Sequence, residues 1–294
     1  MADFEWIIVD DCSTDDSFGE IRQLTGHDRR VLLLRNSENL GFTLTVQRCL
    51  DNAAGKFVYL ADSDDSCDLR FLEVMSGLLE ANPNAGFAYC RGLRMDAKNG
   101  VWGGLPRQKP RYIKAPNAFP EQVLNFTIRQ PTALFRADKI REIGGFARLP
   151  LKGTSDWYLV LRLALVADVI FHPEPLGYHR SHGDNMSGKP AVGLENFLLL
   201  QDVFDHLPDD LRHFESLRMP AYRAAAAQMR ASVEQLHLLG REQEYREALD
   251  TMRHYVPDFE THPGNGHGYR LARMLAQALA KLLTYRRLTP GGSR

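Results

Sequence analysis

Short apolar segments alternate with helical ones along the first ninety residues, and this alternation constrains the fold more than any other feature of the sequence. The apolar segments have the length and composition of strands and occupy residues 4–9, 30–35, 56–61 and 86–90. Between them lie segments with helical capping signals or helical apolar spacing, at residues 14–24, 43–54 and 69–82. Almost continuously apolar strands that alternate with helices are typical of a parallel sheet covered on both faces. We therefore expect an α/β fold with a Rossmann-type, mostly parallel sheet and helices on both faces.

The rest of the chain predicts two further regions. Residues 92–130 are rich in glycine, proline and basic residues and predict an irregular segment that forms a mobile loop or lid. A strand at 130–136 and helices at 137–146 and 155–167 follow, and beyond residue 192 the pattern is wholly helical. We therefore expect one domain over residues 1–191 and a helical C-terminal extension over residues 192–294.

Composition argues against several classes of protein. The 36 lysines and arginines balance 37 aspartates and glutamates, and the formal net charge of -1 argues against nucleic-acid binding. The 4 cysteines are scattered without a C-x-x-C pair, which is typical of reduced thiols and not of a disulfide framework or a zinc site. No apolar run reaches the roughly 20 residues that span a bilayer, and the N-terminus lacks a signal-peptide pattern. These features predict a cytoplasmic location.

Two acidic clusters directly follow strands. "VDDCSTDD" (9–16) comes after the first strand, and "ADSDDS" (61–66) comes after the third. In parallel sheets ligands bind outside the carboxyl ends of the strands, so both clusters should line one crevice. Carboxylates this close repel and raise one another's pKa unless a cation neutralises them. Two carboxylates that are two residues apart can hold Mg²⁺ or Mn²⁺ and leave other coordination positions to water and substrate phosphates.

The second cluster also has partial similarity to a calcium loop. The match to positions 1, 3, 5 and 12 of an EF-hand consists of Asp62, Asp64, Ser66 and Glu73. The sixth position of such a loop must be glycine, whereas here it is Cys67, and a strand precedes the cluster where a helix is required. A solvated turn remains the alternative to a metal site.

Six short motifs follow one another along residues 4–187. They are "IIVDDCSTDDS", "RNSENLGFT", "FVYLADSDD", "TALFRADKIREIGGF", "TSDWYLVLRLA" and "EPLGYHRSHGDNMS". In this order they resemble the motifs of family 2 glycosyltransferases, inverting enzymes of GT-A fold that use nucleotide-diphosphate sugars. The resemblance implies a GT-A-like fold, a nucleotide-diphosphate-sugar donor and a divalent metal cofactor, Mn²⁺ or Mg²⁺.

The resemblance also assigns roles to the acidic clusters. Asp11, with Asp10 beside it, corresponds to the acid that meets the nucleotide base and ribose. Asp64 corresponds to the metal ligand of the D-x-D motif, and Asp62 helps to hold the metal and the diphosphate. For Asp10 the alternative is a carboxylate that only caps backbone N–H groups of its own turn.

Three residues further along the chain complete the implied site. Asp156 corresponds to the catalytic base, and its place at a helix N-terminus predicts a low pKa, although it could simply stabilise that helix. Arg180 corresponds to a residue that faces the diphosphate, and His182 to a metal ligand or diphosphate contact. The alternatives are a surface ion pair for Arg180 and an ordinary loop histidine for His182.

The sequence departs from the family pattern in four places. The family begins with an additional strand and a Pro-x-Tyr-Asn-like turn, so the first family strand is expected to be missing from residues 1–191. Ser155 stands where the family has glutamate before the base, Cys67 where an aromatic residue follows D-x-D, and Val46 where arginine is frequent. The missing first strand and Ser155 favour, as an alternative to an enzyme, a non-catalytic remnant that binds a nucleotide sugar or a partner protein.

The resemblance implies transfer of a single sugar from the donor to an acceptor hydroxyl, with a cell-envelope polysaccharide, a glycan or a lipid-linked glycan as acceptor. A sugar-nucleotide nucleotidyltransferase shares a similar sheet, but it should carry a glycine-rich phosphate loop near its N-terminus, and none is visible.

The last segment of the chain carries no acidic residue from 267 to 294. Its apolar residues form one helical stripe with basic residues alongside, over residues 267–288. Such a stripe can dock on its own domain or lie on an anionic membrane surface, which would make the protein peripheral to the inner face of the membrane.

Overall fold

In the computed structural model, the described residues are 3–104, 108–125, 128–146, 149, 151, 153–182 and 190–259. The chain divides into two compact units. The first consists of Met1–Lys114 and Ile128–His182, and the second of Ala115–Thr127 and Gly183–Arg294. The expected domain boundary at residue 191 stays a prediction, because residues 183–189 beside it lie outside the described ones.

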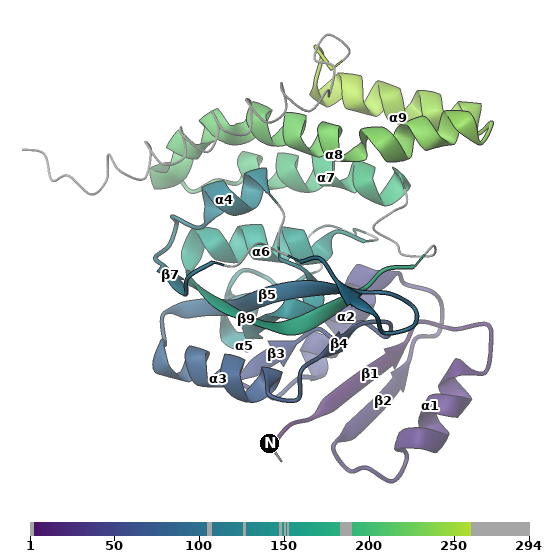
Figure 1. The fold of residues 1–294 in the computed structure, drawn as a ribbon, viewed down its shortest axis with the longest axis vertical. Coiled ribbons are helices and arrows are strands. Elements are labelled where there is room, and N and C mark those ends of the chain that lie inside the picture. The colour runs from purple at the N-terminus through teal and green to yellow at the C-terminus, as the bar shows by residue number, and fades with distance from the viewer. Residues whose placement is uncertain are drawn as a thin grey trace, which may run out of the picture. The chain divides into compact units, whose positions relative to one another are not determined.

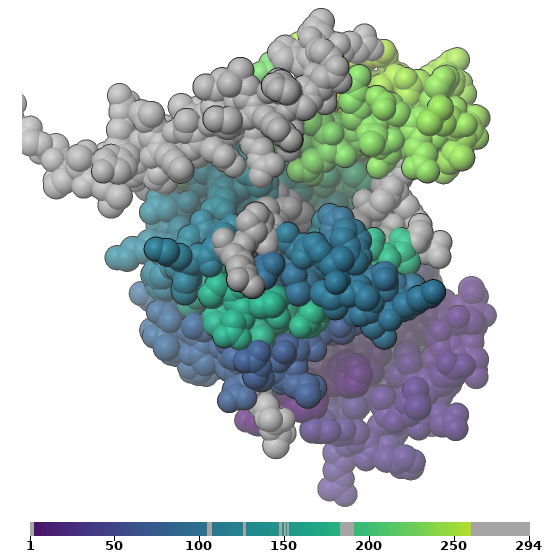
Figure 2. Space-filling model, in the orientation of Figure 1, coloured from purple at the N-terminus to yellow at the C-terminus, as the bar shows by residue number. Residues whose placement is uncertain are grey.

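The first unit begins with a small parallel sheet. Its strands β1 (Trp6–Asp10) and β2 (Val31–Arg35) are connected through helix α1 (Ser17–Thr25), and helix α2 (Phe42–Asn52) follows. Figure 2 shows this purple segment at the lower right. It is thinly packed: no residue of α1 is buried, and of the two strands only Asp10 is. Among the described strands, β1 pairs only with β2. The expectation that the first strand of the family is missing stays a prediction.

The main sheet of the first unit has seven strands. Its order is β3 (Phe57–Tyr59), β8 (Ala133–Arg136), β5 (Ala85–Met95), β9 (Asp168–Arg180) and β4 (Ser66–Cys67), with β6 (Val101–Trp102) on β5 and β7 (Arg111–Ile113) on β9. The two longest registers of the unit, β1–β2 and β5–β9, are parallel, and the short strands pair antiparallel. Strand β9 of the long parallel pair ends at Arg180, which is bonded to the acidic turn described below.

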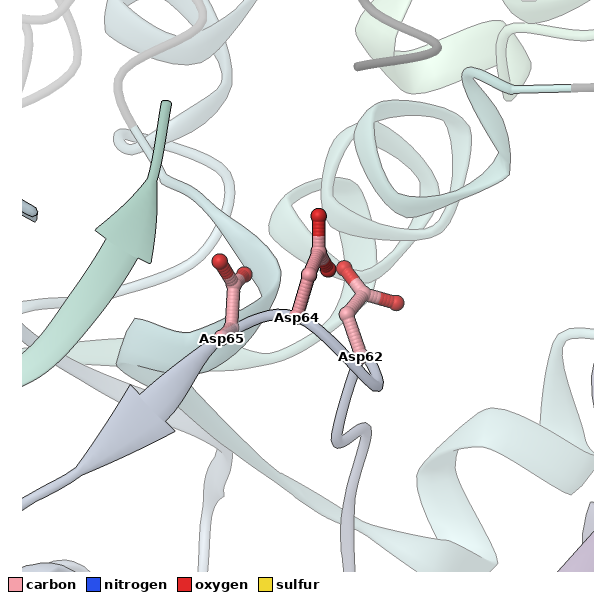
Figure 3. Close-up of side chains that lie close together, drawn as sticks. All are labelled: Asp62, Asp64 and Asp65. Atoms are coloured by element: carbon pink, nitrogen blue, oxygen red, sulfur yellow. The ribbon is translucent and has the colours of Figure 1, made fainter. Parts of the chain in front are cut away.

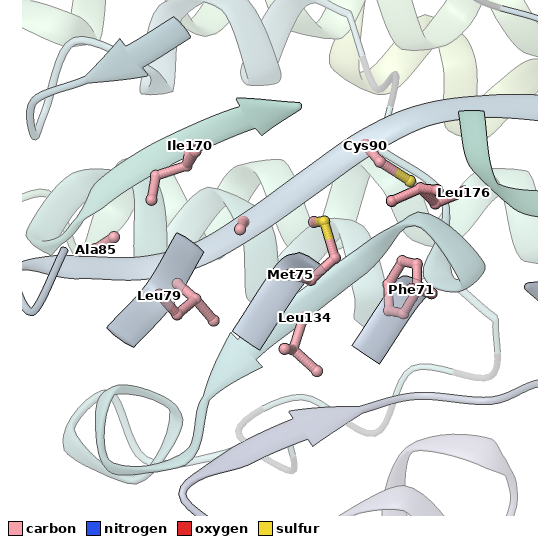
Figure 4. Packing of buried hydrophobic residues seen from close by; sticks show 9 residues of the cluster. Phe71, Met75, Leu79, Ala85, Cys90, Leu134, Ile170 and Leu176 are labelled. Carbon is pink, nitrogen blue, oxygen red and sulfur yellow. The ribbon is translucent and has the colours of Figure 1, made fainter. Parts of the chain in front are cut away.

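Helices cover the long strands on two sides. Helix α3 (Phe71–Ala81) and helix α6 (Ser155–Val166) both contact β5 and lie on opposite sides of it (Figure 1). Phe71, Met75 and Leu79 recur every four residues along α3, so they share one face and pack into the core (Figure 4). Each is fully buried, which contributes about 1.5–3 kcal/mol apiece. The expected α/β fold with helices on both faces is confirmed.

The expectation of an irregular loop at residues 92–130 was wrong in part, and its mobility stays a prediction. Strand β5 continues to Met95, and β6, β7 and helix α4 (Phe119–Leu124) follow within this segment. The apolar run of β5 stops at Cys90, but its next residues still pair with β9, from Arg91 to Met95. A strand that is buried on one face only has a weak hydrophobic pattern in its sequence, because its other face tolerates polar side chains.

The second unit is helical, as expected for the C-terminal extension. Besides α4 it contains α7 (Pro190–Asp205), the 3-10 segment η3 (Asp209–Leu217), α8 (Arg218–Leu238) and α9 (Glu242–Tyr255). Aromatic side chains join these elements: the ring of Phe119 lies 6.1 Å from that of Phe204 and 5.3 Å from that of Phe214. No helix in the described parts of the chain is long and apolar enough to cross a membrane. The basic stripe at residues 267–288 lies outside the described residues.

Candidate active site

The second acidic cluster forms a tight turn between β3 and β4. Asp62, Asp64 and Asp65 each offer a carboxylate oxygen, and these oxygens lie within 4.8 Å of one another. The Asp65 N–H donates to the Asp62 carbonyl at 3.3 Å and closes the turn. Figure 3 shows the three side chains on the same side of the turn, with those of Asp62 and Asp64 next to each other. The fold therefore brings together the two acids of the D-x-D motif, Asp62 and Asp64, and places Asp65 beside them.

The electrostatics of this turn favour a cation. Burial, together with the neighbouring Asp65, Asp156 and Asp64, raises the pKa of Asp62 to about 7. Burial also raises the pKa of Asp65 to about 6, against the opposing effect of the Arg180 N–H. The mutual repulsion expected from the sequence is therefore present. Three clustered carboxylates are hard oxygen ligands of the kind that Mg²⁺ and Mn²⁺ prefer, so the residues fit the implied metal.

The end of β9 is bonded to the acidic turn. The Nε2 atom of His182 lies 2.8 Å from Oδ2 of Asp64. The backbone N–H of Arg180 donates to Oδ1 of Asp65 at 2.7 Å, and its Nε donates to the Asp64 carbonyl at 2.7 Å. Both residues thus lie beside the acidic turn. Their contact with a donor stays a prediction.

Asp156 lies in the first turn of α6 and is close enough to the acidic turn to raise the pKa of Asp62. Its own pKa is raised to about 6, mainly by burial. The N–H of Trp157, 2.7 Å from Oδ1, and the charge of Arg129 act in the opposite direction. The low pKa expected from the helix N-terminus was therefore wrong, because loss of hydration outweighs the favourable helix dipole. Asp156 is nevertheless in the site that the D-x-D acids form.

Basic residues that were not predicted lie beside these acids. Arg129 precedes the 3-10 turn η1 (Gln130–Thr132), and its charge interacts with Asp156 and Asp65, while burial lowers its pKa. His179 on β9 has its pKa lowered to about 4 by burial and by the neighbouring Arg129, so it is neutral at neutral pH. The only signal for Arg129 in the sequence is its place directly before the strand motif "QPTALFR". A single arginine in a glycine- and proline-rich segment does not predict such a role.

The carboxylates of Asp10 and Asp11 bind other groups of the N-terminal segment. Asp10 is buried, forms an ion pair with Nε of Arg35 at 3.1 Å and accepts from the Ser13 N–H. Asp11 accepts from the N–H groups of Leu40 and Gly41, each at 2.8 Å, and from the Asn36 side chain at 2.7 Å. These bonds order the "NLG" turn, in which Gly41 adopts φ 79. The bond from the Ser13 N–H is of the kind named as the alternative for Asp10, a carboxylate that caps backbone N–H groups of its own turn. Contact of either acid with a nucleotide stays a prediction.

The sequence comparison places the first half of the chain in a known family. Residues 1–144 match the profile of Glycosyl transferase family 2. A curated relative is the putative teichuronic acid biosynthesis glycosyltransferase TuaG of Bacillus subtilis, 39% identical over 62 residues, which are 21% of this chain and 25% of that protein. The chain spans only part of its curated relatives, between 17% and 58% of the length of the first three.

Solved structures share the fold over most of the chain. The crystal structure of S. aureus TarS 1-349 superposes with a TM-score of 0.62 at 16% identity and covers 97% of this chain and 83% of that one. TarS 1-349 has also been solved in complex with UDP-GlcNAc. The mannosyltransferase PcManGT of Pyrobaculum calidifontis, in complex with GDP-Man and Mn²⁺, gives a TM-score of 0.50 at 16% identity over 93% of this chain and 76% of that chain.

The family profile covers the "VDDCSTDD" segment, the "NLG" turn and the acidic turn that the structure joins to Asp156 and the end of β9. The α/β fold of the first unit agrees with that of glycosyltransferases of the GT-A type. The chain therefore carries a Glycosyl transferase family 2 domain.

Proposed function

We propose that this protein is a glycosyltransferase that moves one sugar from a nucleotide-diphosphate donor to an acceptor hydroxyl with inversion, in the synthesis of a cell-envelope glycan. The observation that carries the proposal is the convergence of Asp62, Asp64 and Asp65 with Asp156. The family match and the fold shared with UDP-GlcNAc- and GDP-Man-bound enzymes support it. The name of TuaG, a teichuronic acid enzyme, supports an envelope glycan as the product.

Asp64 and Asp62, with Asp65 and His182 beside them, are the residues that would hold Mn²⁺ or Mg²⁺. A metal bound there would supply positive charge to offset that of the donor diphosphate, including the charge that develops as the diphosphate leaves. Without it, three carboxylates would repel the diphosphate. The acids therefore make donor binding dependent on a divalent cation.

Asp156 would act as the general base. Its carboxylate accepts the proton of the acceptor hydroxyl while that oxygen attacks the anomeric carbon, on the face opposite the departing diphosphate. A pKa of about 6 suits this task, because the group is still mostly ionised at neutral pH and is a stronger base than an ordinary aspartate. The positive charge of Arg129 keeps the carboxylate ionised in its buried surroundings.

The test compares Asp156→Asn with the wild-type enzyme. Release of the nucleoside diphosphate from a panel that includes UDP-GlcNAc and GDP-mannose identifies a donor, and calorimetry measures its binding. Loss of general-base assistance is expected to lower turnover about 10²–10⁴-fold and to leave donor affinity nearly intact. Asp64→Ala is the matched control, because it should reduce binding and turnover together. Near-normal turnover of Asp156→Asn would place the base elsewhere, and a wild-type protein that binds donors without turnover would favour the non-catalytic alternative.

We also propose a cytoplasmic location, peripheral on the inner face of the membrane, through residues 267–288. The support is the sequence of that segment alone, which combines an apolar stripe with basic residues and no acidic ones.

A further inference from the structure

Arg180, the last residue of β9, is bonded to two separate turns of the first unit. Its backbone N–H and its Nε bind the acidic turn, at the Asp65 carboxylate and the Asp64 carbonyl. Its Nη1 atom donates to the Asp96 carbonyl at 2.8 Å and to Oδ1 of Asn99 at 2.9 Å, in the turn between β5 and β6. Three of the five guanidinium N–H groups are therefore committed to other parts of the same chain.

The turn between β5 and β6 is a well-ordered support. The Asp96 N–H donates to the Gly100 carbonyl, and the Asn99 N–H donates to the Asp96 carbonyl, at 3.0 and 3.1 Å. Oδ1 of Asp96 accepts from the N–H groups of Lys98 and Gly100, both at 2.8 Å. Asn99 has φ 64, in the left-handed region that asparagine tolerates better than most residues. This closed network holds the Asp96 carbonyl and the Asn99 side chain in place for Arg180.

The acidic turn, in contrast, contains groups that repel one another. Only one of its backbone hydrogen bonds is internal, from Asp65 to Asp62, and it is long at 3.3 Å. The bond from Arg180 to the Asp64 carbonyl restrains the peptide group between Asp64 and Asp65, and the bond from its backbone N–H restrains the Asp65 carboxylate directly. A planar guanidinium can do this because its N–H groups point in fixed directions.

We infer that Arg180 is a positioning residue that ties the acidic turn to the β5–β6 turn and so keeps Asp64 and Asp65 in a metal-binding arrangement. The metal part of this inference rests on the proposed function. It gives Arg180 a different task from direct contact with the donor diphosphate, which the sequence predicted. It also assigns an indirect role to Asn99, which lies in neither acidic cluster.

Two variants separate this role from the effect of charge. Arg180→Lys keeps the positive charge but cannot reach both turns with a rigid fork. Asn99→Gly keeps the backbone, since glycine adopts φ 64 readily, and removes only the acceptor of one Nη1 bond. Lys98→Ala is the matched control, because it changes the same turn and no hydrogen bond of its side chain to Arg180 is seen in the described part of the chain.

The first measurement is amide hydrogen exchange of residues 61–67 in the metal-free protein. Loss of the charge-assisted bonds is expected to speed exchange of this peptide about tenfold in Arg180→Lys and by a smaller factor in Asn99→Gly, with Lys98→Ala unchanged. Unchanged exchange in both Arg180→Lys and Asn99→Gly would overturn the inference. Because no metal is present, this result does not depend on the proposed function.

The second measurement is calorimetric titration of Mn²⁺ without nucleotide. Positioning predicts about 10–100-fold weaker Mn²⁺ binding in Arg180→Lys and a smaller loss in Asn99→Gly, as for other groups that orient metal ligands. If Mn²⁺ affinity is unchanged and only nucleoside-diphosphate affinity falls, Arg180 contacts the donor directly and the inference is wrong. If the wild-type protein binds no Mn²⁺, the metal proposal fails, while the exchange experiment still decides whether Arg180 orders the turn.

Discussion

Replacement of Asp62 by asparagine is expected to stabilise the metal-free protein at pH 8. Burial and three neighbouring carboxylates raise the pKa of Asp62 from 3.8 to about 7. A carboxyl group whose pKa is higher in the folded protein binds its proton more tightly there than in the unfolded chain. The free energy of unfolding therefore falls as the pH rises from about 4 to about 7, and it stays low above that range. Asparagine cannot ionise, so the variant avoids this loss.

The size of the effect follows from the shift. A rise of roughly three pKa units corresponds to about 4 kcal/mol, at 1.36 kcal/mol per unit. Part of it arises from neighbouring acids that can themselves bind protons or counter-ions, so about 2–4 kcal/mol is the expected gain. For a folded unit of this size, that gain raises the melting temperature by roughly 5–10 °C.

Thermal unfolding of both proteins, followed by circular dichroism in a chelator between pH 5 and pH 8, measures this gain. The difference between variant and wild type should grow steadily from pH 5, where somewhat more than a third of it is present, to its largest value at pH 8. Asp209→Asn is the control, because the Asp209 side chain is fully exposed and its replacement should change the free energy of unfolding by no more than about 0.5 kcal/mol. Added Mn²⁺ should reverse the order by stabilising only the wild type. Equal pH dependence of the two proteins, or a less stable variant at pH 8, would refute the reasoning.

Two further changes test the site and the C-terminus. The Ser155 hydroxyl is buried without a hydrogen-bond partner among the described residues. Ser155→Ala should therefore leave the free energy of unfolding unchanged or raise it by up to about 1 kcal/mol. A clear loss of stability in chemical denaturation would reveal an unrecognised hydrogen bond. Truncation after Pro263 should abolish co-sedimentation with anionic vesicles, which should also weaken at high salt, since each basic residue near such a surface contributes about 1 kcal/mol. Co-sedimentation that survives the truncation would assign binding to another surface.

The sequence predicted the features that depend on periodicity and on order along the chain. Alternating apolar and helical segments gave the α/β class, and the acids after the third strand indicated the turn at Asp62–Asp65. The resemblance links this turn to Asp156 and to the end of β9, although these segments are far apart in the sequence, and the roles that it assigns to them stay predictions. The structure brings Arg180 and His182 to the acidic turn through the antiparallel pairing of β9 with β4, the strand that directly follows this turn.

The sequence did not predict features that depend on burial or on hydrogen bonds between distant segments. The pKa of Asp156 is raised because the folded chain removes water from it, and a helix pattern contains no information about that. Arg129 enters the site through tertiary packing alone. The carboxylate of Asp11 is engaged by the backbone of Leu40 and Gly41, about thirty residues away, which only the folded turn reveals.

Calorimetric titration of UDP and GDP into the wild-type protein, once with Mn²⁺ and once with a chelator, tests the central claim most directly. A divalent cation held by Asp62 and Asp64 should make at least one diphosphate bind measurably better with Mn²⁺ than with chelator, because the acidic turn otherwise repels phosphates. The Asp64→Ala variant should lose this dependence on metal. Equal affinity with Mn²⁺ and with chelator, or no binding of either nucleotide under both conditions, would contradict the account.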